Sequence, residues 1–424
     1  MSAAVMQPMP APGIQAQPGK LPAVLVIGGA VVAPLNLLIV RSFTVYDLLV
    51  GIALLWLLRE RRFVWPAPRY LAATYVFMLA ILLGTFRATY AIEALTQVLQ
   101  YVFIFFVQIP VVISVVNTRA RAITATALLC LGTLAAILLA YVYRPTQGAG
   151  RVVVFYSENP NRLGYPAAYL IPLLVVLWVL SREAGRSVRL MATVAVLIGL
   201  YLSIWAVTAS GSRSSMLGAG IALLVLVVMK PGLGPWRAAG RLVALLGVCG
   251  VIGFVLNVTG QLPHTLEERI NRSLDTTDTE SQAHLVADRE NLNEAGAMAF
   301  FDNPLVGTGL DNFRYVAPEY VIEATPQLPH NLWLQLAVQV GAVGTAAFAI
   351  WLLFWAVDVV RAVRRAQSLD AALLWGLFAA MAGILAIFMF TPEMLDRHYW
   401  LIAALGLAVV QGHRTNLTAG GLRP

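Results

Sequence analysis

Long runs of apolar residues, many of them long enough to cross a lipid bilayer, dominate the chain and are separated by short polar segments. A transmembrane helix needs about 20 mostly apolar residues. The pattern therefore predicts an all-α polytopic membrane protein with about twelve transmembrane helices. The predicted spans are residues 21–40, 44–58, 70–86, 97–116, 122–143, 165–181, 190–209, 215–229, 242–258, 331–357, 371–390 and 400–411.

The polar segments divide the chain into five parts. Residues 1–20, rich in Pro, Ala and Gln, are predicted to form a disordered cytoplasmic tail, and residues 412–424 a second cytoplasmic tail. Nine spans occupy residues 21–258, and three more occupy residues 330–411. Between these two groups, residues 259–329 form a long polar insertion that we expect to be a separate helical loop domain outside the membrane.

Composition excludes several classes of protein. Of the 424 residues, 59% are hydrophobic and only 12% are charged, with a mean hydropathy of +0.77. A water-soluble domain carries about 25% charged residues, so a cytosolic enzyme, a nucleic-acid binder and a disordered chain are all excluded. The net charge of +8 instead indicates basic cytoplasmic loops, and the expected surroundings are membrane lipids.

The distribution of charge predicts how the protein lies in the membrane. If the N-terminus is cytoplasmic and the spans alternate, the inner segments hold 18 of the 29 Lys and Arg residues and only four of the 21 Asp and Glu residues. The net charge is then +14 inside and −6 outside. Because basic residues favour the cytoplasm, both termini are predicted to lie inside and the 259–329 insertion outside.

The insertion itself has the pattern of a helix with a defined end. Its apolar residues Leu285, Leu292, Ala295 and Phe300 follow helical spacing. Asp302-Asn303-Pro304 should end this helix, since Pro cannot continue it and Asn and Asp favour turns. The later Gly307-Thr308-Gly309 is predicted to be a turn.

Candidate chemistry gathers in four outer segments: Glu158–Arg162, Ser210–Ser215, Asp288–Glu290 and Pro329–Asn331. Three of them carry an arginine, namely Arg162, Arg213 and Arg289. A guanidinium group offers a planar fork of donors that matches phosphate oxygens, and it keeps its charge at any relevant pH. These arginines could hold a lipid diphosphate at the membrane surface. Alternatively they only anchor helices at the interface or pair with loop carboxylates.

Among the histidines, His330 has the sequence context of a catalytic base. Pro329 fixes the turn before it, and Asn331 could orient the imidazole by hydrogen bonding. A histidine with a pKa near 6.5 is a suitable general base, although the residues by themselves favour packing at a helix entrance. The other histidines, including His398, are expected to be surface or interfacial residues.

Signals for a metal are missing from the sequence, and the glycines have a simpler interpretation. No His/Cys cluster has zinc spacing, and the outer segments hold no Asp-x-Asp pair, so neither a metal nor another cofactor is expected. Gly341 and Gly344 in the tenth span are predicted to permit close helix packing.

Together these motifs resemble the O-antigen ligase family and its O-antigen polymerase relatives, which are bacterial membrane glycosyltransferases with a large outer loop. The resemblance is sharpest between Ser212 and Gly344. At Gln339 the chain departs from many relatives, which have Glu there. The residues that carry the resemblance, in chain order, are Ser212-Arg213-Ser214, Arg289, Pro304-x-x-Gly307-x-Gly309, His330-Asn331, Leu334, Gly341 and Gly344.

The resemblance implies a GT-C-like helical fold in the bacterial inner membrane, with the active site facing the periplasm. It implies transfer of a glycan from undecaprenyl diphosphate to a sugar hydroxyl of lipid A–core, without a metal and with inversion. His330 would be the base, Arg213 and Arg289 would hold the diphosphate, and Arg162 would assist. Substrate contacts are further implied for Asn161, Asn331 and Ser212.

Three other functions remain possible at this stage. An O-antigen polymerase and a protein-directed oligosaccharyltransferase belong to the same family. A lipid-linked glycan flippase belongs to a different class and would also bind a lipid diphosphate. Ion-coupled transporters usually carry ionisable residues at mid-membrane depth, whereas these spans are almost free of charge.

Overall fold

The computed structural model describes residues 19–40, 42–147, 151–228, 234–258, 279–366, 368–391 and 394–420. Residues 1–18 of the predicted tail at 1–20, residues 421–424 of the predicted tail at 412–424, and the insertion residues 259–278 lie outside the described residues. The structure is 77% helical, which confirms the all-α prediction. Seven helical segments of the described chain are long and apolar enough to cross a membrane: Pro68–Thr85, Ile92–Val115, Arg119–Tyr143, Asn161–Ser181, Arg186–Ser210, Leu332–Arg365 and Asp370–Phe388. Twelve spans and a GT-C fold remain predictions.

The helices and strands follow the predicted apolar runs closely. In the first half they are α1 (Lys20–Gly29), the 3-10 turn η1 (Ala33–Leu35), β1 (Leu38–Val40), β2 (Phe43–Thr44), α2 (Val45–Arg59), α3 (Pro68–Thr85), α4 (Ala91–Val102), the π-helical η2 (Phe103–Gln108), α5 (Ile109–Val115), α6 (Arg119–Tyr143), β3 (Thr146–Gln147), β4 (Arg151–Val152), α7 (Asn161–Gly164) and α8 (Ala167–Ser181). In the second half they are α9 (Arg186–Ser210), α10 (Arg213–Val228), α11 (Pro235–Val258), α13 (Thr279–Asp302), α14 (Phe313–Tyr320), α15 (Leu332–Arg365), α16 (Ser368–Phe388) and α17 (Arg397–Gly420).

The first predicted span is wrong as a single helix. Residues 21–40 are apolar except for Asn36, but α1 ends at Gly29 and the chain turns at Asn36, whose φ is 46°. Residues Leu38–Val40 then pair with Phe43–Thr44 as an antiparallel hairpin. Pro34 and the left-handed Asn36 interrupt helix geometry, which a count of apolar residues does not register.

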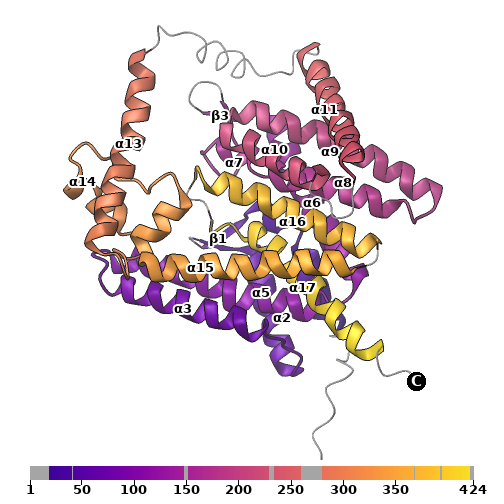
Figure 1. The fold of residues 1–424 in the computed structure, drawn as a ribbon, viewed down its shortest axis with the longest axis horizontal. Coiled ribbons are helices and arrows are strands. Elements are labelled where there is room, and N and C mark those ends of the chain that lie inside the picture. Colours follow the sequence, from indigo (N-terminus) through magenta and orange to yellow (C-terminus); the bar gives the residue numbers. More distant parts are fainter. Residues whose placement is uncertain are drawn as a thin grey trace, which may run out of the picture.

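The core lies where the long helices pack side by side. Figure 1 shows α3 running along α15, with α16 and α17 packed nearby. Five aromatic side chains from α3, η2, α15 and α17 interlock there, with ring centroids 5.0–5.9 Å apart: Phe77, Phe105, Phe348, Trp351 and Trp400. Offset and edge-to-face rings of this kind fix the helices more specifically than aliphatic contacts do.

The polar segments gather at two ends of the helix bundle. At one end, here called the basic end, Arg69 at the start of α3 pairs with Asp358 of α15. In the same group, Arg119 at the start of α6 lies 3.2 Å from Glu183 and 3.3 Å from Asp370. Each of these ion pairs joins segments that the alternating topology assigns to the same side.

The other end, here called the loop end, carries the predicted outer segments. Arg87 after α3 donates to Asn303 at 3.1 Å, and the backbone N–H of Thr89 donates to Asn312 at 3.0 Å. Figure 1 shows α13 and α14 together at this end of α3 and α15. Helix α13 ends at Asp302, which confirms the predicted stop before Pro304. The predicted insertion therefore has helices beside the membrane bundle.

Candidate active site

Two predicted segments that are far apart in sequence pack against each other at the loop end. Gly211, with φ of 57°, ends α9 and allows the sharp turn into α10. A Cβ on Gly164 of α7 would lie 2.5 Å from the hydroxyl oxygens of both Ser210 and Ser215. This approach brings the helix that carries Arg162 against the turn that carries Arg213.

Ser212 and Arg213 differ in exposure although they are neighbours. Ser212 is buried, accepts the backbone N–H of Ser215 at 3.3 Å and shares a 3.0 Å hydrogen bond with Ser214. Its hydroxyl thus supports the start of α10 in the manner of an N-cap. Arg213 is exposed as the first residue of that helix. Its charge stands where the positive end of the helix dipole also favours an anion.

Arg151 in β4 is a residue that the sequence argument missed. Its Nε donates to the Ser210 carbonyl oxygen at 2.7 Å, and its Nη2 donates to Asn161 Oδ1 at 2.6 Å. It therefore joins the end of α9 to the start of α7. In the sequence it counts only as one more outer basic residue, since its partners are 59 and ten positions away. The sequence offered one signal for this role, namely a single arginine directly before the apolar run Val152-Val153-Val154.

Arg162 faces the segment that leads into α17. Its Nη2 lies 4.0 Å from Asp396 Oδ1. His398, two residues later, is only 2% exposed and lies between the rings of Tyr169 and Tyr399, with centroids 5.5 and 4.2 Å away. The expectation that His398 is a surface or interfacial residue is wrong, because α17 begins inside the bundle and buries its first turn.

The segments that carry Arg289 and His330 come together where α13 packs on the first part of α15. Leu292, Ala295 and Ala299 of α13 share an apolar cluster with Phe313 of α14 and Val338 of α15. This small core confirms the helical face predicted for the insertion at its described positions. It also fixes the helix that carries Arg289 beside the entrance to α15.

His330 and Arg289 are brought near each other by this packing. Arg289 is exposed on α13, whereas His330 is half-buried directly before α15. Burial, and secondarily the positive charge of Arg289, lower the pKa of His330 below its ordinary value of 6.5. Both causes disfavour imidazolium, so the neutral imidazole that can accept a proton is favoured.

Asn331 begins α15. Its side-chain oxygen accepts the backbone N–H groups of Trp333 at 2.9 Å and Leu334 at 3.3 Å. These are the bonds of an N-cap, which satisfy two donors that the first turn would otherwise leave unpaired. Asn331 therefore fixes the backbone next to His330, and the sequence had suggested a direct bond to the imidazole instead.

Residues between α16 and α17 contact both the segments around Arg162 and Arg213 and the segments around Arg289 and His330. On one side the Trp333 indole N–H donates to Met389 at 3.1 Å. On the other side Asp396 faces Arg162 at 4.0 Å. The two groups of predicted residues are thus at the same end of the bundle, linked through the residues that end α16 and precede α17.

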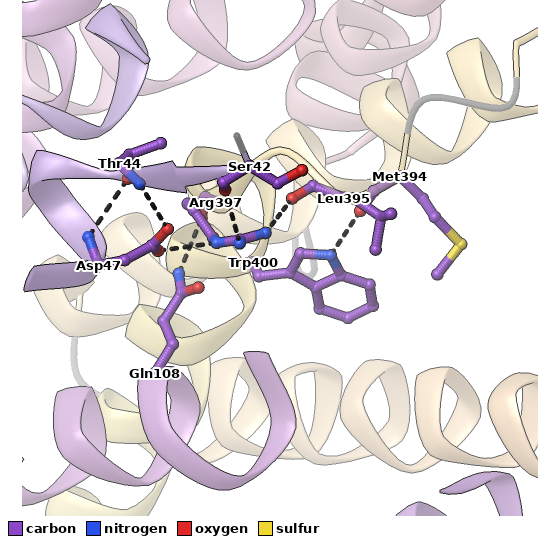
Figure 2. Close-up of polar contacts among 8 residues, drawn as sticks. All are labelled: Ser42, Thr44, Asp47, Gln108, Met394, Leu395, Arg397 and Trp400. Carbon is purple, nitrogen blue, oxygen red and sulfur yellow. Dashed lines mark hydrogen bonds and ion pairs between the residues drawn. The ribbon is translucent and has the colours of Figure 1, made fainter. Parts of the chain in front are cut away.

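Arg397 anchors the residues that precede α17 to the rest of the bundle, as Figure 2 shows. It is 5% exposed, and its Nε donates to Asp47 of α2 at 2.8 Å. The Nη1 of Arg397 donates to the Leu395 carbonyl at 2.6 Å, and the Gln108 side chain donates to the backbone carbonyl of Arg397 at 2.7 Å. Asp47 in turn completes a capping box with Thr44 at the start of α2.

Among the described residues, no three His, Cys, Asp or Glu side chains gather as a metal site requires. Positive charge for an anionic ligand is offered at the loop end by arginines. The arrangement of an exposed arginine at a helix start, a second beside a half-buried histidine, and membrane-spanning helices below suits a lipid with an anionic head.

Residues 198–349 match the family model described as O-antigen ligase. The resemblance to the O-antigen ligase family is confirmed. The matched segment runs from α9 into α15 and includes Ser212, Arg213, Arg289, His330 and Asn331. Proteins of the O-antigen ligase family are glycosyltransferase-like ligases and polymerases, which act on lipid-linked glycans in membranes. No curated protein matched the chain.

Proposed function

We propose that this protein is an O-antigen ligase that transfers a glycan from undecaprenyl diphosphate to a sugar hydroxyl of lipid A–core. The observation that supports it most is that the segments carrying Arg162 and Arg213 pack against each other and that Arg289 lies near His330. Both places are at one end of the helix bundle, and residues 198–349 of that bundle match the O-antigen ligase family model. The proposed reaction needs anion-binding and proton-accepting groups together at a membrane surface.

The arginines serve the donor in this proposal. Arg213 and Arg289 bind the diphosphate oxygens, and Arg162 is a further contact held by Asp396. Fixed guanidinium groups stabilise negative charge as it builds on the departing lipid diphosphate, which makes a metal unnecessary for this role. Asn161 and Ser212 support these arginines from the neighbouring turns, through Arg151 and the start of α10.

His330 serves the acceptor. Its neutral imidazole takes the proton of the lipid A–core hydroxyl while that oxygen attacks the anomeric carbon of the donor sugar. The bond between the anomeric carbon and the phosphate oxygen breaks, and its electron pair leaves with undecaprenyl diphosphate. Attack opposite the leaving group inverts the anomeric centre. Asn331 holds the backbone beside His330 through its cap of α15.

The proposed location is the bacterial inner membrane, with the loop end in the periplasm and both termini in the cytoplasm. The predicted charges of +14 and −6 on the two sides support it. The test is cysteine labelling with an impermeant maleimide, at Ile322→Cys on the loop end and Arg186→Cys on the other side. Both residues are exposed. Labelling of position 322 with the inner membrane intact, and of position 186 only after it is opened, is expected; the reverse overturns the orientation.

One assay separates the proposed activity from its alternatives. Purified protein is mixed with undecaprenyl-diphosphate glycan and, in parallel, with lipid A–core, with a second copy of the donor, or with an acceptor protein. Glycosylated lipid A–core is the expected product. Lengthened donor glycan would indicate a polymerase, and a glycoprotein would indicate a protein-directed oligosaccharyltransferase. Donor movement across proteoliposomes without any new glycosidic bond would indicate a flippase.

A further inference from the structure

Helix α15 is broken nine residues after it begins. Gly341 has φ of 67° and ψ of −175°, which separates a first segment, Leu332–Val340, from the rest of the helix. A break of this kind interrupts the backbone ladder, so the carbonyls of Val338 and Gln339 and the N–H of Ala342 need other partners. Inside a membrane protein such groups are tolerated only where neighbouring protein satisfies them.

Residues 303–312, here called the strap, supply those partners. The Val338 carbonyl accepts the Thr308 backbone N–H at 2.7 Å and the Thr308 hydroxyl at 3.1 Å. The Gln339 carbonyl accepts the Gly309 N–H at 3.0 Å, and Ala342 donates to the Pro304 carbonyl at 2.7 Å. The strap therefore replaces, bond for bond, the helix contacts that the break removes.

Glycines on both sides make this backbone-to-backbone contact possible. A Cβ on Gly341 would lie 2.2 Å from the Leu305 carbonyl oxygen, and one on Gly307 would lie 2.5 Å from the Gln339 carbonyl carbon. Gly307 also has φ of 70°, which confirms the predicted turn at 307–309. The expectation that Gly341 serves ordinary helix packing is wrong. Gly344 does serve it, since a Cβ there would lie 3.0 Å from Ala80 of α3, as well as 2.6 Å from the Val340 side chain of its own helix.

The strap is also fixed to the elements around it. It continues directly from α13, which carries Arg289, and its Asn312 side chain accepts the backbone N–H of Thr89, after α3, at 3.0 Å. The first segment also contacts α13, since a Cβ on Gly296 of α13 would lie 3.3–3.4 Å from the side chain of Leu334. The first segment is held by α13 and the strap, with His330 at its entrance.

We propose that Thr308 and Gly341 are positioning residues, which fix the first segment of α15 so that His330 keeps its place relative to Arg289 and the donor diphosphate. This inference rests on the proposed function, because it assigns His330 and Arg289 their roles. A continuous helix or a loose strap would let the first segment shift, and a shift of about 1 Å at a reacting group can cost on the order of 10²-fold in rate.

The first test compares Thr308→Val with Thr308→Ser. Valine removes the hydroxyl donor to Val338 and keeps the shape, while serine retains the donor. We expect Thr308→Val to lower kcat roughly tenfold with the donor KM changed less than about twofold, and Thr308→Ser to restore kcat. Thr345→Val is the matched control, since that hydroxyl donates to the Gly341 carbonyl at 2.7 Å beyond the break. Wild-type kcat in Thr308→Val, or equal losses in both valine variants, overturns the proposal.

The second test measures position without relying on activity. In a chain with Cys130 and Cys249 replaced by Ala, Gly296→Cys and Leu334→Cys should form a disulfide, and its rate of formation reports the contact between α13 and the first segment. Gly341→Ala should slow it, whereas the control Gly220→Ala in α10, where a Cβ would meet nothing within 4 Å, should leave it unchanged. An unchanged rate in Gly341→Ala overturns the positioning role, even in a protein that shows no transfer at all.

Rescue joins the two measurements. If the strap acts by holding the first segment, closing the 296–334 disulfide should restore kcat in Thr308→Val. Restored disulfide geometry with no gain in kcat contradicts the proposal. The two proposals can also fail separately. If the wild type forms no new glycosidic bond but Gly341→Ala still slows disulfide formation, the proposed function is rejected and the structural role of the strap stands.

Discussion

The two ends of the helix bundle use arginine differently. At the basic end, Arg69 pairs with Asp358, and Arg119 lies between Glu183 and Asp370. Each of these pairs joins separate helices or the loops next to them. At the loop end, Arg213 and Arg289 are exposed at the surface. Arg151, Arg162 and Arg397 also join elements at the loop end, so that end combines structural arginines with the exposed Arg213 and Arg289.

The loop end also contains its own contrast. Arg397 is buried and bound to Asp47, two carbonyl groups and the face of Phe103, with its guanidinium carbon 5.3 Å from that ring. It has no room for a ligand, and its position holds the residues that precede α17. Burial thus separates a structural arginine from the exposed candidates for ligand binding, and variants at both kinds of position test this distinction.

The largest expected effect is the loss of an arginine from the proposed site. Arg213→Ala and Arg289→Ala should each reduce transfer by about 10³–10⁵-fold, the range for an arginine that stabilises a departing phosphate. Lysine should rescue poorly, since an ammonium lacks the bidentate geometry. Transfer is measured on purified protein, with thermal unfolding as the check on folding. A wild-type rate in either alanine variant would remove that residue from the site.

The second largest effect on transfer is expected from the loss of the proposed base, His330. His330→Ala should reduce kcat by about 10²–10⁴-fold and leave donor binding intact, because the arginines remain. His330→Gln should do little better, as it offers hydrogen bonding without a comparable base. Donor binding and transfer are measured on the same preparation. Normal binding with near wild-type transfer would show that His330 is not the base, whereas parallel loss of folded protein would indicate a packing role.

The structural arginine should affect stability more than chemistry. Asp47→Asn keeps an acceptor for the capping box but leaves Arg397 buried without its counter-ion. Breaking a buried pair in this way should lower the free energy of unfolding by about 3–5 kcal/mol. Asp47→Asn combined with Arg397→Gln should recover part of that loss in thermal or denaturant unfolding. No destabilisation in the single variant would mean that the pair is not the anchor inferred here.

Acidity should affect the loop end through His330. Because the pKa of His330 is lowered, the neutral base persists below pH 6.5 and kcat/KM should decline only at more acidic pH. Below the folded pKa the rate should fall by about tenfold per pH unit as the imidazole takes up a proton. A pH–rate profile of the wild type checks this expectation. His330→Gln is the control, because its profile should lack the fall in rate at acidic pH. An acidic limb centred above pH 6.5 would contradict it.

The smallest effect is expected at the basic end. Arg119 and Glu183 have side chains that are 43% and 58% exposed, so water screens their attraction. Arg119→Ala should therefore change the free energy of unfolding by less than about 1 kcal/mol and leave transfer unchanged. Thermal unfolding and the transfer assay on one preparation provide the comparison with Arg213→Ala. A large loss of transfer here would erase the distinction between the two ends.

Local patterns predicted much of the fold and the positions of the candidate residues. The apolar runs predicted most helices, because a helix inside a lipid bilayer needs apolar side chains. The end of α13 at Asp302 and the turn at Gly307–Gly309 follow from the preferences of Pro, Asn, Asp and Gly. The match over residues 198–349 confirms the resemblance to the O-antigen ligase family in the part of the chain that contains Arg213, Arg289 and His330.

The sequence by itself therefore determined a helical membrane protein, the sorting of its polar segments and the residues with suitable chemistry. Only the tertiary structure decided that His398 and Arg397 are buried, that Arg151 joins α7 to α9, and that the strap completes the break at Gly341. The physical reason is that membrane helices are apolar on all sides, so no stripe marks which face meets protein. Partners such as Asp47 and Arg397, separated by 350 residues, meet only when the whole bundle has packed.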